Sequence, residues 1–205
     1  PRCKNKGDTA LRFEIATKID GKDDPRFRSQ QKMGNDRQYN GKWYHIAIVY
    51  DGTKNSTKDA YQMYINGVKE ELTPADNSYA DVAPNTYLDL SEVKGDEALM
   101  IGRSGNSKYR LGYCNVAQAR MWKTARTQEQ IKEDMCKYYT PEEARANENL
   151  LGYWIPGNGI ETGTFKNYGS AGTDLDAKVY TQGDHISETT VNADKFASTA
   201  CPHTY

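Results

Sequence analysis

The fold of this chain is constrained most by a series of short segments in which apolar residues recur at every second position. Each segment is bounded by a turn that contains glycine. In segment 10–17, Leu11, Phe13 and Ile15 share one face, and charged residues stand between them. Segment 43–50 reads WYHIAIVY and is apolar on both faces, as a central strand requires. Because successive strand side chains point to opposite faces of a sheet, both patterns predict β-strands.

The strongest hairpin signal lies between segments 61–66 and 68–72. Asn66 and Gly67 tolerate positive φ angles, which a two-residue turn between antiparallel strands requires. Further strand candidates are segments 98–102, 116–122 and 150–155. Many short strands separated by tight turns favour an all-β fold, a two-sheet antiparallel sandwich or jelly roll.

Two short helices are predicted between the later strands. Thr127 and Gln130 form a T-x-x-Q capping box, and Thr140 followed by Pro141 is typical of a second helix start. Segment 73–93 is long, polar and contains tyrosine. We expect it to cross the surface, where loops of this length are often functional.

Composition excludes two classes of protein. The chain has 27 Lys plus Arg and 28 Asp plus Glu, so its net charge of -1 provides no basic field for general nucleic-acid binding. No apolar run approaches the roughly 18 residues of a membrane-spanning helix. Tyrosine is abundant, with 15 Tyr against 4 Phe. Its apolar ring and polar tip suit half-buried surfaces and binding faces.

Four widely spaced cysteines, Cys3, Cys114, Cys136 and Cys201, form no CxxC motif and no Cys/His cluster. A zinc site is therefore not predicted. The spacing permits disulfides in three connectivities, and it also permits buried free cysteines. His45 lies within the predicted central strand, and we interpret it as a structural histidine.

No recognisable catalytic constellation is present. The chain lacks the G-x-S-x-G, H-E-x-x-H, P-loop and EF-hand motifs. The adjacent carboxylates Glu70-Glu71 and Glu142-Glu143 lie beside the hairpin and at a helix start, where solvated side chains account for them. A glycosidase needs two opposed carboxylates in one cleft. We therefore expect the chain not to be an enzyme.

Three stretches follow one another in a recognisable order. They read GKWYHIAIVYDGT at 41–53, YQMYING at 61–67, and further on ARMW, RTQEQI and LLGYW. This order resembles the laminin-G-like branch of the concanavalin A-like lectin/glucanase superfamily, as found in surface proteins of Bacteroidota. Segment 167–177, NYGSAGTDLDA, is similar to that family's terminal segment. The resemblance covers roughly residues 10–180 and implies a curved jelly roll with one or two short helices.

The resemblance also implies a domain division. Residues 1–180 would form the jelly roll with its first strands missing, and residues 181–205 a C-terminal strand or tail. Family members begin with further strands, whereas only nine residues precede segment 10–17 here. We expect an open sheet edge, which a completing N-terminal segment or a partner strand would pair with. The E-x-D-x-x-E triplet of the glucanase branch is absent, so the resemblance does not imply hydrolysis.

The function implied by the resemblance is non-catalytic carbohydrate binding at the bacterial cell surface. Aromatic rings at the rim stack on sugar C–H faces, and polar loop residues fix the hydroxyl groups. The candidate ligand-binding residues are Tyr79, Tyr87, Arg103, Asn106, Tyr109, Arg110 and Tyr113. Two alternatives remain: a protein-interaction or scaffold module of a surface glycan-uptake complex, and an accessory domain of a glycosidase.

Calcium and location also follow from the resemblance. Many superfamily members hold one Ca²⁺ through oxygen ligands, and Asp174 and Asp176 are the candidate ligands, although a solvated turn accounts for both. The expected location is extracellular or outer-membrane associated, as in a surface lipoprotein. The expected partners are a glycan and outer-membrane uptake proteins, with no nucleic acid and no transmembrane span.

Overall fold

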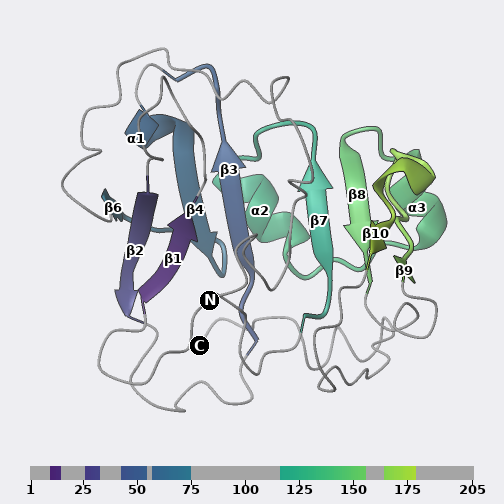
Figure 1. Cartoon of the computed structure of the whole chain (residues 1–205), viewed down its shortest axis with the longest axis horizontal. Helices are drawn as coiled ribbons and strands as arrows, with labels where there is room; N and C mark the ends of the chain where they lie inside the picture. Colours follow the sequence, from purple (N-terminus) through teal and green to yellow (C-terminus); the bar gives the residue numbers. More distant parts are fainter. Residues whose placement is uncertain are drawn as a thin grey trace. The chain divides into compact units, whose positions relative to one another are not determined.

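The computed structural model describes six stretches of the chain (Figure 1). These are residues 10–14, 26–32, 43–54, 57–74, 116–155 and 164–178. The chain divides into two compact units. The first unit comprises residues 1–42 and 46–114, and the second comprises residues 43–45 and 115–205. The predicted boundary at residue 180 lies outside the described residues and stays a prediction.

One antiparallel sheet of the first unit has the strand order β1-β2-β6. Its strands are β1 (Ala10–Glu14), β2 (Arg26–Lys32) and β6 (Leu72–Pro74). Strand β1 confirms the start of the predicted segment 10–17, whose last three residues lie outside the described ones. Strand β2 was not predicted, because RFRSQQK contains a single large apolar residue, Phe27, and so shows no alternation.

The predicted hairpin forms the centre of a second sheet in this unit, with the order β3-β4-β5. It contains β3 (Ile46–Tyr50), β4 (Tyr61–Ile65) and β5 (Val68–Lys69), and the short helix α1 (Thr57–Ala60) precedes β4. The φ angles of Asn66 and Gly67 are 51° and 75°, which confirms the two-residue turn.

The strand after the turn is shorter than predicted. Strand β5 ends at Lys69, and Leu72 instead begins β6, where it pairs with Ser29 of β2. The predicted excursion 73–93 therefore begins only after Pro74, and the rest of it lies outside the described residues.

Strand β3 was predicted to be a central strand, and its central position stays a prediction. Among the described strands of the first unit it lies at the edge of its sheet, paired only with β4. Val49 is buried, whereas Ile46 and Ile48 are 38% and 51% exposed. The apolar character of both faces, which favoured a central strand, thus leaves isoleucines exposed on one face.

The sheet of the second unit is built on β8 (Leu150–Trp154), which pairs antiparallel with β7 (Ala119–Trp122). Segment 168–171 also runs along β8, since the amides of Tyr168 and Ser170 donate to the carbonyls of Tyr153 and Leu150 at 2.9 and 2.8 Å. Both strands confirm the predicted segments, in shortened form. A separate two-stranded pair joins β9 (Thr164–Phe165) to β10 (Ala177–Lys178), with a 3-10 turn, η2 (Gly172–Leu175), before β10.

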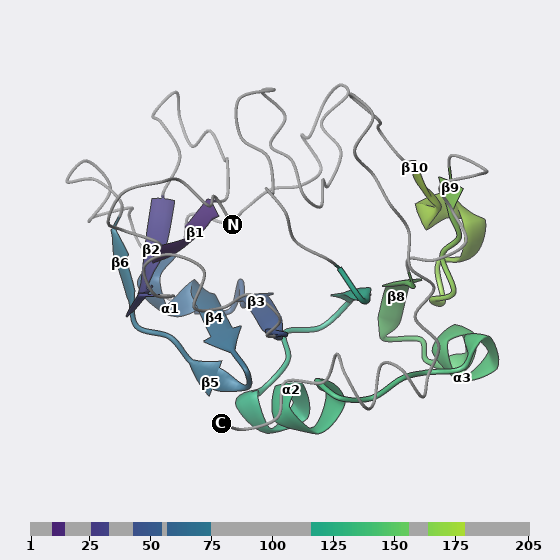
Figure 2. The same ribbon diagram turned by 90° about the horizontal axis from the view of Figure 1, so that it is seen from below.

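Helices α2 (Gln128–Asp134) and α3 (Pro141–Ala146) lie on the same side of β7 and β8 (Figure 2). The predicted capping box at Thr127 and the predicted helix start at Thr140 are both confirmed, and Thr140 also forms a capping box. The hydroxyl oxygens of Thr127 and Thr140 each accept a hydrogen bond from the third helical amide, and the side chains of Gln130 and Glu143 accept one from the backbone amide of the cap residue. Ala144 of α3 packs with Leu150 and Tyr153 of β8, and these three fully buried side chains form a hydrophobic core of this unit.

Cys136 lies half-buried in the turn after α2 and is disulfide-bonded. Its partner cysteine lies outside the described residues. Of the two alternatives that the spacing left open, disulfide and buried free thiol, this cysteine takes the first. In the described stretches, no helix has the length and apolar character to cross a membrane.

Candidate functional site

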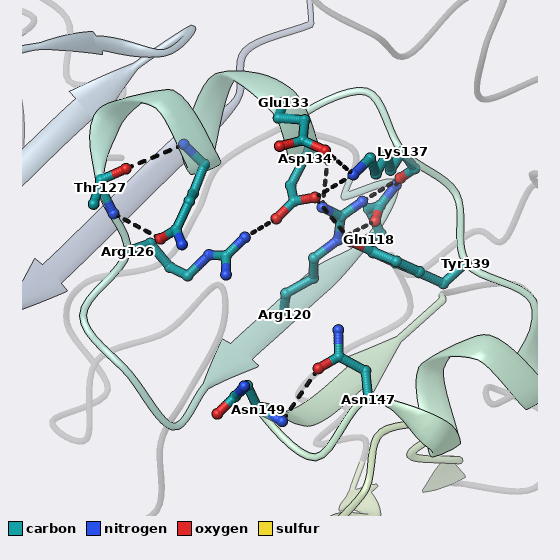
Figure 3. Close-up of polar contacts among 11 residues, drawn as sticks. Gln118, Arg120, Arg126, Thr127, Glu133, Asp134, Lys137, Tyr139, Asn147 and Asn149 are labelled. Carbon is teal, nitrogen blue, oxygen red and sulfur yellow. Dashed lines mark hydrogen bonds and ion pairs between the residues drawn. The ribbon is translucent and has the colours of Figure 1, made fainter.

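The densest polar group of the second unit joins β7 to the end of α2 (Figure 3). We call it the Arg120–Asp134 cluster, and it consists of Gln118, Arg120, Arg126, Asp134, Lys137 and Tyr139. The sequence folds this way locally because the capping box at Thr127 starts α2 directly after β7. The helix therefore ends beside the strand that precedes it.

Arg120 holds the cluster together. Its Nη1 donates to the carbonyl of Asp134 at 2.6 Å, its Nη2 donates to the carbonyl of Lys137, and its Nε donates to Oε1 of Gln118 at 2.8 Å. The guanidinium also lies 5.1 Å from the ring centre of Tyr139 and 5.8 Å from that of Tyr153. A planar fork of fixed donors suits this set of partners, because it reaches several oxygens at once while stacking on rings.

Asp134 is only 6% exposed, yet it has several partners. Its carboxylate pairs with Arg126 and with Lys137, the latter at 3.0 Å, and accepts a hydrogen bond from the Tyr139 hydroxyl at 2.9 Å. Burial alone would raise the pKa of Asp134. The hydrogen bonds from Lys137 and Tyr139 and the charge of Arg126 outweigh burial and hold the pKa below its usual value.

His45 belongs to the same unit, and the charges of the cluster shift its pKa. Burial, followed by the positive charge of Arg120, lowers the pKa of His45 to about 4, and the charge of Asp134 opposes this only in part. The imidazole is therefore neutral at physiological pH, in agreement with its interpretation as a structural histidine.

The chemistry available to the cluster is limited. Asp134 is the only buried carboxylate among the described residues, and the neighbouring Glu133 side chain is 68% exposed. Hydrolysis of a glycosidic bond needs two carboxyl groups facing one substrate. Since the Asp134 carboxylate is also held by three neighbours, the cluster is suited to fixing α2 on β7 rather than to acid–base chemistry.

A second buried polar group lies at Asn167, whose side chain is fully buried. Its Oδ1 accepts hydrogen bonds from the amides of Tyr153 and Gly169, each at 2.8 Å. Its Nδ2 donates to the carbonyls of Leu151 and Gly172, at 3.0 and 2.9 Å. We call this group the Asn167 junction. It satisfies one side-chain amide completely and ties segment 167–172 to β8.

Both candidate calcium ligands lie at this end of the unit. Asp174 is exposed on η2, and Asp176 follows it. Oδ1 of Asp176 accepts a hydrogen bond from the Asn167 amide at 2.7 Å, so this carboxylate already has a structural role. No group of three or more metal-ligating side chains occurs among the described residues. Calcium at Asp174 and Asp176 therefore stays a prediction.

The predicted ligand-binding residues all lie outside the described residues. They are Tyr79, Tyr87, Arg103, Asn106, Tyr109, Arg110 and Tyr113. Which of them come together thus stays a prediction. The sequence did contain signals for the two buried groups, since Arg120 stands in the ARMW strand and Asn167 opens the NYGSAG segment, but their partners lie at long sequence separations.

The comparisons with known proteins identify the family. Residues 5–132, more than half of the chain, match the family described as the concanavalin A-like lectin/glucanases superfamily. The chain belongs to this family, and its fold class is therefore an all-β, antiparallel jelly-roll sandwich. No curated protein and no solved structure is significantly similar to it.

Membership defines the kind of protein but not one activity. Domains of this superfamily often bind carbohydrate and are commonly non-catalytic, although some members are glycosidases. Members also often bind Ca²⁺ or other metals.

Proposed function

We propose that the chain is a non-catalytic carbohydrate-binding module that works outside the cell. The observation that carries the proposal is the family match over residues 5–132, since this superfamily often binds carbohydrate. The described residues support the non-catalytic part, because their one buried carboxylate, Asp134, is engaged by its neighbours.

The proposed location is the bacterial cell surface, with attachment to the outer membrane as in a lipoprotein of the Bacteroidota. The disulfide at Cys136 supports an extracytoplasmic position, because disulfides persist in oxidising compartments and are rare in the cytosol. Outer-membrane proteins that take up glycans are the proposed neighbours.

The proposed ligand site consists of rim tyrosines with polar loop residues. Tyr109 and Tyr113 stand near Arg103, Asn106 and Arg110 in the sequence, so this segment contains both aromatic rings and hydrogen-bonding side chains. Such a mixture suits a sugar, whose apolar C–H face stacks on a ring while its hydroxyls take hydrogen bonds. Calcium at Asp174 and Asp176 is not part of the proposal.

The test is a glycan array, followed by calorimetry on any glycan that binds. We expect Tyr109→Ala and Tyr113→Ala to weaken binding by about 1–3 kcal/mol each, because stacked aromatic area is lost. The matched variants Tyr109→Phe and Tyr113→Phe keep the ring and should lose about 1 kcal/mol or less. If both alanine variants bind as tightly as the parent, the site lies elsewhere and Tyr79 and Tyr87 are tested next.

Hydrolysis is followed on the same glycans by product release. We expect none, and turnover abolished by changing one Asp or Glu would contradict the non-catalytic assignment.

A second candidate, a protein-interaction module, is favoured by one observation. Ile46, Ile48 and Val68 are 38%, 51% and 57% exposed in the β3-β4-β5 sheet. Ile46 and Val68 both lie opposite Ile65 in the register, so they share a sheet face. Absence of binding to any glycan, together with capture of outer-membrane uptake proteins by the parent but not by Ile48→Lys, would support this alternative.

A further inference from the structure

One edge of β8 is covered by a segment that is not itself a strand. On the other edge β8 pairs with β7. Residues 167–172, which we call the strap, begin with five residues that form neither helix nor strand. Three strap amides nevertheless donate to β8 carbonyls, in the pairs Tyr168–Tyr153, Ser170–Leu150 and Ala171–Leu151, at 2.9, 2.8 and 3.2 Å. Irregular backbone therefore satisfies the carbonyl groups along this edge.

The side chain of Asn167 takes the place of a peptide group where β8 presents an amide. Its Oδ1 accepts from the Tyr153 amide at 2.8 Å, and its Nδ2 donates to the Leu151 carbonyl at 3.0 Å. These two groups flank Gly152 in the sequence. A residue of a parallel strand makes the same pair of bonds, to the residues on either side of its partner. Asn167 thus continues the hydrogen-bond ladder of β8 without a neighbouring strand.

The strap lies so close to β8 that only glycine fits at position 169. A Cβ on Gly169 would lie 2.4 Å from the carbonyl oxygen of Leu151 and 2.7 Å from that of Leu150. The Gly169 amide also donates to Oδ1 of Asn167, so the four consecutive amides of residues 168–171 all have partners within β8 or the strap. The strap therefore presents no row of free amides with which a further strand could pair.

We propose that the strap is an edge lock, which ends the sheet at β8 and prevents β8 from pairing with β8 of a second copy of this chain. An open edge presents unpaired N–H and C=O groups that recruit other strands, and natural sheets cover such edges. The partner is a second copy because both copies would present the same row of groups. Two such edges can pair antiparallel about a two-fold axis.

The test is Gly169→Ala in the whole chain, a change that removes no polar group but displaces the strap. Size-exclusion chromatography with light scattering gives the mass over a range of concentrations, and NMR gives the exchange rate of the Tyr153 amide. At low concentration we expect this amide to exchange about ten-fold or more faster than in the parent. At high concentration we expect about twice the parent's mass, together with renewed protection of the Tyr153 amide.

Exchange of straps between two copies is distinguished by the same variant. An added Cβ at position 169 would meet the same two carbonyls in either copy, so a swapped strap would fit no better than the chain's own. If Gly169→Ala does not fold, as judged by circular dichroism, Asn167→Ser provides the same two readouts, because it removes the amide that bonds to Tyr153 and Leu151.

Two matched controls test the specificity of the effect. A Cβ on Gly52 would make only an ordinary contact, 3.4 Å from the Tyr50 ring, so Gly52→Ala controls for the type of substitution. Ser170→Ala controls for a change within the strap, because the Leu150 carbonyl loses the Ser170 hydroxyl but keeps the Ser170 amide. Both should keep the parent's mass and change the exchange of the Tyr153 amide by less than about two-fold.

Four results would overturn the proposal. They are an unchanged exchange rate of the Tyr153 amide, an unchanged mass at every concentration despite fast exchange, a doubled mass without renewed protection of this amide, and an equal gain of mass in either control. The third result would place the contact between copies elsewhere on the chain.

Discussion

The Arg120–Asp134 cluster and the Asn167 junction both attach a covering segment to a strand of the second unit, but they use opposite chemistry. The cluster uses charged groups, and the Asp134 carboxylate alone has three partners from different positions. The junction uses one neutral amide, which makes four hydrogen bonds to backbone atoms. We infer that the stability contributed by the cluster depends on pH, but that the cluster keeps other partners when one is removed. The stability contributed by the junction should not depend on pH, but it rests on the Asn167 side chain alone.

The largest effect is expected from Asn167→Ala. The change leaves the amides of Tyr153 and Gly169 and the carbonyls of Leu151 and Gly172 without their partner in a buried place. Unsatisfied buried polar groups are costly, so we expect the free energy of unfolding to fall by about 3–5 kcal/mol. Urea unfolding followed by circular dichroism at pH 7 measures it.

The control for this variant is Asn149→Ala, since Asn149 is exposed in the same unit. It should change the free energy of unfolding by less than about 0.5 kcal/mol. A loss below about 1 kcal/mol for Asn167→Ala would show that water or relaxation replaces the amide, and the contrast between the two buried groups would fail.

Arg120→Lys is expected to have the next largest effect. A lysine presents its donors at one point, so it cannot reach the carbonyls of Asp134 and Lys137 and the side chain of Gln118 together. We expect a loss of about 2–4 kcal/mol in the free energy of unfolding, part of which is the cost of an incompletely paired, half-buried charge. The same urea titration measures it.

Arg126→Lys is the variant to compare with Arg120→Lys, because it alters a cation of the same cluster that has fewer partners. Arg126 pairs with Asp134 and stacks 4.1 Å from the Trp122 ring centre, but Asp134 keeps Lys137 and Tyr139 when Arg126 is altered. We expect a loss of about 1 kcal/mol. Equal losses for the two variants would contradict the view that Arg120 holds the cluster and that the other cations are spare partners.

The titration of His45, which lies in the field of the charged cluster, should make stability depend on pH in a way that the neutral junction does not. The folded pKa, about 4, lies below the unfolded value of 6.5, so the unfolded chain binds more protons between these values. The stabilising contribution of neutral His45 is therefore complete above pH 6.5 and is lost as pH falls toward 4. Between pH 7 and pH 5 we expect it to shrink by about 2 kcal/mol.

The measurement compares the parent with His45→Gln in urea titrations at several pH values. The difference in stability between the two proteins should change over this window, while Asn167→Ala should lower stability equally at both ends of it. Asp134 titrates in a lower range, because its folded pKa is depressed and its contribution is lost only as pH falls below the unfolded value. Parallel pH profiles for the parent and His45→Gln would contradict the burial of His45 beside Arg120.

Prediction from sequence succeeded where the signal was local. Asn66-Gly67 fixes its hairpin through the φ angles of two adjacent residues, and the capping boxes at Thr127 and Thr140 act within one helical turn. It missed β2, whose seven residues contain one large apolar side chain, and the two-residue strands β9 and β10, which are too short to show a period.

The buried polar groups could not be predicted for a different reason. Arg120 and Asp134 are 14 residues apart, as are Asn167 and Tyr153, and a charged or amide side chain at such a distance has no periodic signature. By residue type alone, arginine, aspartate and asparagine side chains are expected at the surface. Only the folded arrangement of β7, β8 and the helices shows that Asp134 and Asn167 are buried, that Arg120 is half-buried, and that all three have partners.

An effect as small as that of Arg126→Lys is expected from the two helix caps, of which one belongs to the helix that ends in the cluster and the other to the helix that contacts the junction. α2 ends in the Arg120–Asp134 cluster, while α3 contributes Arg145 to the Asn167 carbonyl at 3.2 Å. Thr127→Ala and Thr140→Ala each remove a hydroxyl acceptor from a helical amide, and each should cost about 1 kcal/mol of unfolding free energy.

The serine variants at Thr127 and Thr140 keep the hydroxyl and serve as controls, with expected losses of about 0.5 kcal/mol or less. Salt then distinguishes cap from cluster. Both caps are neutral acceptors, so the alanine losses should be the same in 1 M NaCl, where the Debye length is about 3 Å, whereas the loss from Arg126→Lys should shrink. A cap loss at Thr127 that shrinks in salt would mean that Thr127 acts through a charged neighbour, either Arg126 on Asp134 or the Glu129 carboxylate to which its side chain is hydrogen-bonded, and the neutral cap would then not account for the loss.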